Sequence, residues 1–126
     1  MNVTRQIFLP SPKPGTGVLA ASYYTRATGG EMLSLHQLIS RSDTIDVAYV
    51  RYSSDNGRTW SPPEERAMRE THPNGTLRRH PRGGYVDPAT GRYVTLWVEG
   101  VLPTDQPLEG MKAWQIHYSE IGRAHV

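Results

Sequence analysis

The sequence predicts an all-β fold of short strands joined by tight turns. Gly (12) and Pro (10) are frequent and spread along the 126 residues, which is typical of chains with many turns. No segment keeps a helical period of 3.6 residues over three turns, whereas several segments alternate or form short runs of β-branched and aromatic residues. A chain of this length has room for one small domain.

Two strands are expected in the first half of the chain. Residues 18–24 form a β-type run behind the Pro-Gly-Thr-Gly turn at 14–17. Residues 45–53 alternate between two faces, as a half-buried strand does. Between these strands, the apolar residues of 31–40 could line one side of a short helix. We expect an irregular segment or a strand there.

Further strands are expected in the second half. Tyr85 and Val86 lead into Asp-Pro-Ala-Thr-Gly-Arg at 87–92, which is a strong turn signal. Residues 93–98 form the next strand, and residues 113–118 form another. Strands and turns therefore account for the whole pattern.

The composition excludes several classes of protein. No uncharged apolar stretch approaches the ~20 residues that a membrane helix needs, so no membrane partner is expected. Residues 1–20 contain no apolar core of a secretory signal, so a cytoplasmic product is expected if Met1 is the true start. Cysteine is absent, which excludes disulfide scaffolds and thiol nucleophiles. His36 and His72 have no partner at metal-ligand spacing, so neither a metal nor another cofactor is expected.

The charged residues favour recognition of anions over binding of nucleic acid. The net charge is +2, and it comes from twelve Arg and two Lys against twelve acidic residues. Arginine binds a carboxylate through two parallel hydrogen bonds, whereas lysine acts as a point charge. No basic stripe interleaved with aromatic residues is present, so a nucleic-acid partner is not expected.

A short repeat predicts consecutive blades of a β-propeller. The sequence Val-Arg-Tyr-Ser at 50–53 returns 66 residues later as Ile-His-Tyr-Ser at 116–119. Both copies stand at the end of an expected strand. Internal repeats of strand-ending motifs are typical of propellers, in which four-stranded blades follow one another along the chain.

The residues that follow the first copy predict a turn stabilised by its own side chains. From Ser53 the chain reads Ser-Ser-Asp-Asn-Gly-Arg-Thr-Trp. Ser53 and Asp55 have short oxygen-bearing side chains that can accept hydrogen bonds from backbone N–H groups across the turn. Gly57 can adopt the positive φ that such a turn needs. Thr59 begins the next strand, and Trp60 can bury its ring under the turn. A structural role is expected for all five residues.

This segment resembles the Asp box, or BNR repeat, of the sialidase (neuraminidase) superfamily. The resemblance implies an incomplete six-bladed β-propeller, with about one and a half to two blades of antiparallel four-stranded meander in this chain and the remaining blades missing from it. It also implies a fragment of an exo-glycoside hydrolase that acts on terminal sialic acid or related acidic sugars, inactive without the other blades. Two alternatives remain open: a propeller that binds glycan without cleaving it, and a propeller that serves as a protein-interaction scaffold.

The resemblance assigns three candidate site residues. Arg26, at the end of the run VLAASYYTR, takes the position of an arginine that binds the substrate carboxylate, with Tyr24 in place of the usual Glu. Asp43 takes the position of the catalytic acid/base, and Arg5 lies near the family's Arg-Ile-Pro motif but out of register with it. A surface arginine at a strand edge and a turn aspartate are the structural alternatives for Arg26 and Asp43. The nucleophilic Tyr, its Glu partner and the remaining arginine would come from other blades.

Alternation of turns between the two ends of a meander extends the set of candidates. In the family, the Asp box lies at the end away from the active centre. We therefore expect the connections at 25–43, 64–81 and 99–111 at the active end, and the turn at 87–92 at the Asp-box end. The titratable residues that this rule selects are Arg26, Glu31, His36, Arg41, Asp43, His72, Arg78, Arg79, Arg82 and Glu99.

Three of these residues are added to the substrate-binding candidates. Arg78 and Arg79 could form an anion-binding patch, for which a solvated loop is the alternative. Glu99 ends a strand in front of a Pro-rich loop, where a site residue is plausible.

The end of the chain predicts a boundary at Ser119. Residues 120–126 read Glu-Ile-Gly-Arg-Ala-His-Val, which resembles the translation of a common sequencing adapter, and they stand where a second Asp box is expected. We therefore expect residues 1–119 to form the partial propeller domain and residues 120–126 to be a non-native tail.

Overall fold

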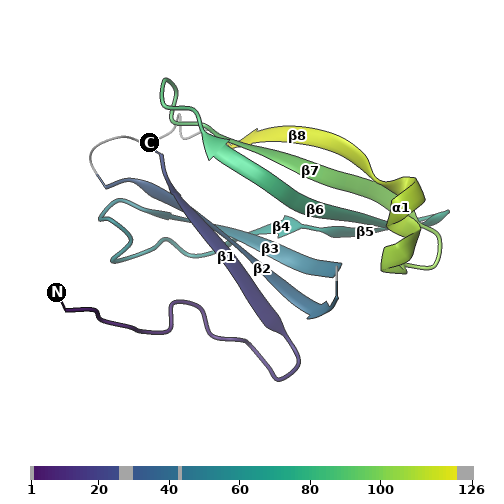
Figure 1. Ribbon diagram of the computed structural model, residues 1–126, viewed down its shortest axis with the longest axis horizontal. Coiled ribbons are helices and arrows are strands. Elements are labelled where there is room, and N and C mark those ends of the chain that lie inside the picture. Colours follow the sequence, from purple (N-terminus) through teal and green to yellow (C-terminus); the bar gives the residue numbers. More distant parts are fainter. Residues whose placement is uncertain (1, 26–29, 43, 122–126) are drawn as a thin grey trace.

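A computed structural model describes residues 2–25, 30–42 and 44–121, and they form two four-stranded antiparallel sheets (Figure 1). Sheet A consists of β1 (Gly17–Tyr24), β2 (Met32–Arg41), β3 (Thr44–Ser53) and β4 (Glu64–Ala67). Sheet B consists of β5 (Arg69–His72), β6 (Gly75–Val86), β7 (Tyr93–Leu102) and β8 (Gln115–Ile121). Neighbouring strands follow one another in the chain, so each sheet is a simple meander. The prediction of an all-β fold is confirmed.

The ambiguous segment at 31–40 is a full strand. β2 pairs with β1 on one side and with β3 on the other. Its pairing with β3 is irregular between Leu38 and Ile39 and again between Ile39 and Arg41. Such bulges interrupt the alternation of apolar and polar residues. The strand therefore lacks the clean period of two that would have identified it from the sequence.

The connection from β7 to β8 contains a helical turn that the sequence pattern did not predict. It consists of the 3-10 helix η1 (Pro107–Glu109) and the short helix α1 (Gly110–Ala113). Seven helical residues are too few for a hydrophobic period to emerge. No helix in the described parts of the chain is long and apolar enough to cross a membrane. β8 starts later than expected, because Ala113 belongs to the helix, and it continues through Glu120, which pairs with Val94.

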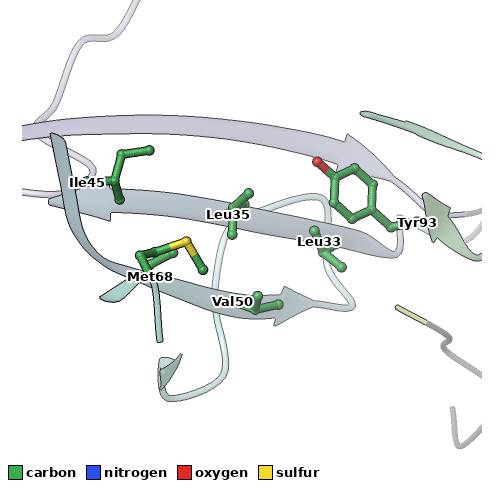
Figure 2. Packing of buried hydrophobic residues seen from close by; sticks show 7 residues of the cluster. Leu33, Leu35, Ile45, Val50, Met68 and Tyr93 are labelled. Atoms are coloured by element: carbon green, nitrogen blue, oxygen red, sulfur yellow. The ribbon is translucent and has the colours of Figure 1, made fainter. Parts of the chain in front are cut away.

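The hydrophobic core lies between the two sheets (Figure 2). Leu33, Leu35 and Val50 of sheet A are 0%, 5% and 0% exposed. They pack with Tyr93 of β7 and with Met68, which is the one residue between β4 and β5. Each such side chain contributes about 1.5–3 kcal/mol when it is buried. Packing in this core therefore fixes how sheet A lies on sheet B.

Three connections meet at one end of the sheets, which we call the Asp-box end. The turn after β3 lies against the β1–β2 connection, since the Asn56 N–H donates to the Gly30 carbonyl at 2.9 Å. The β6–β7 turn joins them, because Gly91 lies against the carbonyl oxygen of Thr25. The expected position of the turn at 87–92 is thus correct.

The other connections meet at the opposite end. Arg41 at the end of β2 bonds to Asp105 in the β7–β8 connection. Gly75, which begins β6 after the β5–β6 turn, lies against the carbonyl of Leu102 at the end of β7. The expected position of the connection at 99–111 is therefore correct, although β7 extends to Leu102.

The expectation that residues 25–43 form one connection at a single end is wrong. β2 fills residues 32–41 and crosses the whole sheet. Thr25 and Gly30 consequently lie at the Asp-box end, whereas Ser42 and Thr44 lie at the opposite end. The segment at 64–81 is likewise mostly strand, and only its turn before Gly75 lies at an end of the sheet.

Candidate functional site

Side chains of the turn between β3 and β4 hold its backbone in place. The Ser53 hydroxyl accepts the N–H groups of Asp55 (3.3 Å) and Gly57 (2.9 Å) and donates to Asp55 Oδ1 (2.8 Å). The Asp55 carboxylate accepts the Thr59 N–H at 2.9 Å and the Thr59 hydroxyl at 2.6 Å. The indole N–H of Trp60 donates to the Gly57 carbonyl at 3.0 Å. All five residues expected to form the Asp box thus take part in one hydrogen-bond network.

Two features make this turn rigid and keep its carboxylate ionised. Asn56 and Gly57 have φ angles of 61° and 78°, a region that favours glycine and tolerates asparagine. The hydrogen bonds from Thr59, followed by the one from Ser53, lower the pKa of Asp55 from its ordinary value of 3.8 to about 2. The turn is therefore satisfied internally, which agrees with a structural role.

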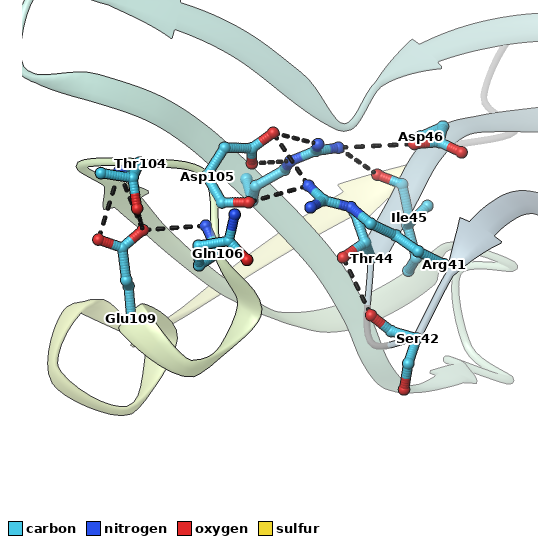
Figure 3. Close-up of polar contacts among 10 residues, drawn as sticks. Arg41, Ser42, Thr44, Ile45, Asp46, Thr104, Asp105, Gln106 and Glu109 are labelled. Atoms are coloured by element: carbon cyan, nitrogen blue, oxygen red, sulfur yellow. Dashed lines mark hydrogen bonds and ion pairs between the residues drawn. The ribbon is translucent and has the colours of Figure 1, made fainter.

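At the opposite end, a buried arginine joins three parts of the chain (Figure 3). The Arg78 side chain is 4% exposed. Its Nε and Nη2 atoms donate to the two carboxylate oxygens of Asp105, each at 2.8 Å. Its Nη1 atom donates to the carbonyl of Ile45 at 3.1 Å and lies 3.8 Å from Asp46 Oδ1. Arg78 thus connects β6 with β3 and with the β7–β8 connection, and its bonding groups already have partners within the protein.

A second arginine approaches the same carboxylate from sheet A. Arg41 Nη2 donates to the main-chain carbonyl of Asp105 at 2.9 Å and to its Oδ2 at 3.0 Å. The Arg41 side chain is 41% exposed. The hydrogen bonds from Arg78, together with the charges of Arg78 and Arg41, lower the pKa of Asp105. This end of the molecule therefore places a carboxylate between two guanidinium groups, one buried and one accessible to solvent.

The loop that holds Asp105 is stabilised by a capping carboxylate. Glu109 accepts the N–H groups of Thr104 and Gln106, each at 2.9 Å, and the Thr104 hydroxyl at 3.0 Å. The hydrogen bond from the Gln106 N–H, followed by those from Thr104, lowers the pKa of Glu109. Asp105 itself has a φ of 57°, so this cap helps to hold a strained backbone.

A groove of about 440 Å³ on the side of sheet B that faces sheet A brings two further candidates together. Arg79 Nη2 lies 3.3 Å from Glu99 Oε1, and Arg79 Nη1 donates to Glu70 Oε1 at 3.0 Å. The hydrogen bond from Arg79 lowers the pKa of Glu70, and His72 adds to this effect. The groove wall also includes Arg66, Met68, Trp97 and His117.

The remaining candidates are placed as follows. Arg26 and Asp43 lie outside the described residues, so their roles stay predictions. Arg5 is exposed in the N-terminal segment before β1. His36, expected in a connection, is instead 7% exposed within β2 and stacks on Tyr49 with ring centroids 5.0 Å apart. Burial and the nearby charge of Arg51 lower the pKa of His36.

Sequence reasoning missed the carboxylates that pair with the arginines. Asp105, Glu70 and Asp46 were not among the candidates. Asp105 is the partner of both Arg78 and Arg41, Asp46 also lies close to Arg78, and Glu70 is the partner of Arg79. The available signal for Asp105 was its place between Pro103 and Pro107 in a connection already expected at the active end. Arg41 was already expected at that end, and the strand at 32–41 keeps it there while it places Gly30 at the Asp-box end.

Two general results complete the description of the site. Within residues 2–25, 30–42 and 44–121, no group of three or more His, Asp or Glu side chains is arranged to hold a metal ion. Comparisons with models of known protein families, with curated proteins and with solved structures found no match.

Proposed function

We propose that this chain forms two consecutive blades of a sialidase-like β-propeller that acts on glycans ending in sialic acid or a related acidic sugar. The observation that supports this proposal is the Asp-box turn. Its own side chains close it between the third and fourth strands of a four-stranded meander. A second meander follows directly and packs on the first. Repetition of such sheets is the plan of a propeller.

The arginine pair supports an acidic ligand at the end opposite the Asp box. The resemblance to sialidases implies that the active centre lies away from the Asp box. Arg41 lies at that end, and its side chain is 41% exposed. The hydrogen bond from Arg41 to the Asp105 carboxylate supports this proposal, because it is the kind of contact that a ligand carboxylate would make. Arginine binds carboxylates with defined geometry, so Arg41 is the best-placed residue for the carboxylate of a sialic acid.

The proposed reaction is hydrolysis of the terminal glycosidic bond. Asp43 follows Arg41 and Ser42 in the sequence, and the pair formed by Arg41 and Thr44 lies at this end. In this proposal, Asp43 protonates the leaving oxygen as the general acid. Arg41 is proposed for binding the carboxylate because it lies at the described end opposite the Asp box, and the role of Arg26 stays a prediction. The family's Tyr nucleophile and its Glu partner would come from other blades.

The test is whether the protein encoded by the complete open reading frame hydrolyses a fluorogenic sialoside. Asp43→Asn is expected to reduce kcat about 10²-fold or more, because it removes the proposed general acid. Arg41→Ala is expected mainly to raise KM. Arg92→Ala is the matched control, since Arg92 is an exposed arginine at the Asp-box end, and it should leave turnover unchanged. A folded protein without turnover would contradict the proposed hydrolase.

Glycan binding without hydrolysis is the second candidate. It is supported by a complete Asp-box turn in a chain whose Arg5 is out of register with the family's Arg-Ile-Pro motif. Saturable binding of N-acetylneuraminic acid by a protein that does not cleave sialosides would support this alternative.

A further inference from the structure

The groove on the side of sheet B that faces sheet A has no part in the proposed hydrolysis. Both sheets line it, with Arg66 from β4, Glu70 from β5, Arg79 from β6, Glu99 from β7 and His117 from β8. Its volume of about 440 Å³ is within the ~300–1,000 Å³ of pockets that bind small molecules. The groove is therefore large enough for a ligand of its own.

Strand register brings the side chains of the groove onto one face of sheet B. Arg79 pairs with Glu99 across β6 and β7, and Trp97 pairs with His117 across β7 and β8. Alternate residues of a strand point to the same side, so Glu99 and Trp97 share this face with their partners. The indole N–H of Trp97 donates to the Ser119 hydroxyl at 2.6 Å. Pairing within the sheet thus fixes the positions of these groups.

The charged groups of the groove are paired and balanced. Arg79 Nη1 donates to Glu70 Oε1 at 3.0 Å, and Arg79 Nη2 lies 3.3 Å from Glu99 Oε1. All three side chains are partly open to solvent. Arg66 is paired with a glutamate of its own strand at 3.2 Å. The two arginines and two glutamates in the wall sum to a charge of zero, and each carboxylate has further acceptor positions for a ligand.

This arrangement disfavours three classes of ligand. An anion would compete with Glu70 and Glu99 for the guanidinium group that they already neutralise. A metal cation would have to displace Arg79 from the same carboxylates. A purely apolar ligand would remove water from charged groups without replacing its hydrogen bonds, which costs free energy. The class that fits is a neutral molecule with many groups that both donate and accept hydrogen bonds.

A neutral sugar has both properties that the groove requires. Its hydroxyl groups donate to carboxylates and accept from guanidinium groups, so neighbouring hydroxyls can bond to Glu99 and Arg79 together. Its ring also carries apolar C–H groups, which pack on aromatic side chains. Trp97 and Tyr118 supply aromatic side chains in the wall of the groove.

We propose that this groove binds a neutral sugar residue, separately from the acidic sugar at the arginine end. Glu70, Arg79 and Glu99 hold the hydroxyl groups of this sugar, and Trp97 packs on its ring. The proposal goes beyond the proposed hydrolase and uses none of the residues assigned to it. Either proposal can therefore fail without the other.

Titration of the isotope-labelled 126-residue chain with neutral methyl glycosides, followed by NMR, tests this site. The probes are the methyl glycosides of galactose, glucose, mannose and N-acetylglucosamine, each raised to about 20 mM, well above a millimolar Kd. At least one should give saturable shift changes at the Trp97 indole N–H and at the amides of Glu70, Glu99 and His117. N-acetylneuraminic acid should not reproduce these changes. Four glycosides without saturable changes in this set would overturn the proposal.

Glu70→Gln tests which groups hold the sugar. It keeps the shape of the side chain and should weaken binding about tenfold, because hydrogen bonds to a charged acceptor are stronger than those to a neutral amide. Glu120→Gln is the matched control. Glu120 is also paired with an arginine, is 43% exposed against 44% for Glu70, and pairs with Val94 on the other side of the sheet. It should leave the affinity unchanged, and equal affinities of the two variants would contradict the site.

Discussion

Individual carboxylates at both ends of the sheets are held in the ionised form by hydrogen bonds. The pKa of Asp55 is lowered to about 2, and those of Asp105 and Glu109 are lowered as well. A group whose pKa falls on folding stabilises the folded state above its unfolded pKa. That contribution is lost as the pH falls through the folded pKa. The native state should therefore weaken in acid as the pH falls from the ordinary carboxylate pKa toward the lowered pKa of the folded state.

Asp55→Asn should reduce the dependence of stability on acid pH. The variant loses the charge-assisted bonds from Thr59, so its melting temperature at neutral pH should be below that of the wild type. Between about pH 4 and pH 2 it should lose less stability than the wild type, because it no longer has this carboxylate to protonate. Thermal melts followed by circular dichroism at several pH values measure both effects. Glu65→Gln, at an exposed carboxylate of β4, is the control, and an identical pH dependence in the Asp55 variant would contradict the assignment.

Arg78→Met should destabilise the protein much more than Arg79→Met. Removal of Arg78 leaves the Asp105 carboxylate and the Ile45 carbonyl without their main partner, and loss of one member of a buried ion pair costs about 3–5 kcal/mol. Arg79 is 25% exposed and its acidic partners remain hydrated, so its loss should cost about 1 kcal/mol or less. Urea unfolding measures the two free energies. Equal losses would show that Arg78 is not the link between the sheets.

At the scale of elements, the turns were easier to predict than the strands between them. The Asp-box turn depends on contacts within eight residues, so its hydrogen bonds could be predicted from the local sequence. The strand at 32–41 depends on pairing with two neighbouring strands. Its bulges interrupt the alternation of apolar and polar residues. The sequence predicted only an irregular segment or a strand there, and residues 25–43 were therefore assigned to one end of the sheet.

Gly75→Ala should be strongly destabilising, whereas Gly83→Ala should not. Gly75 has a φ of 144°, and a Cβ atom there would collide with the carbonyl oxygen of Leu102 and with Pro103. A non-glycine residue in this region costs about 1–3 kcal/mol even before the collision. Gly83 has no neighbour in the way of a Cβ atom, so its change should stay within about 0.5 kcal/mol. Thermal unfolding of both variants tests the β5–β6 turn, and similar losses would contradict it.

At the scale of the whole molecule, the sequence predicts the fold class and the repeat, but not the partners of the charged residues. Arg78 and Asp105 are 27 positions apart, and they meet because β6, β7 and their connection adopt one register. No local pattern records that register. The same holds for Arg79 and Glu99, which face each other across β6 and β7. The predicted set of site residues therefore omitted the carboxylates that bond to its arginines.

The most direct test of the account is a titration of the isotope-labelled chain with N-acetylneuraminic acid, followed by amide NMR. The account predicts that shift changes concentrate at the end opposite the Asp box, around Arg41, Thr44 and Asp105, and that Arg41→Ala removes them. Arg58→Ala, in the Asp-box turn, should leave them in place. Shift changes centred on residues 53–60, or none at millimolar ligand, would contradict an acidic-sugar site at the arginine end of these two sheets.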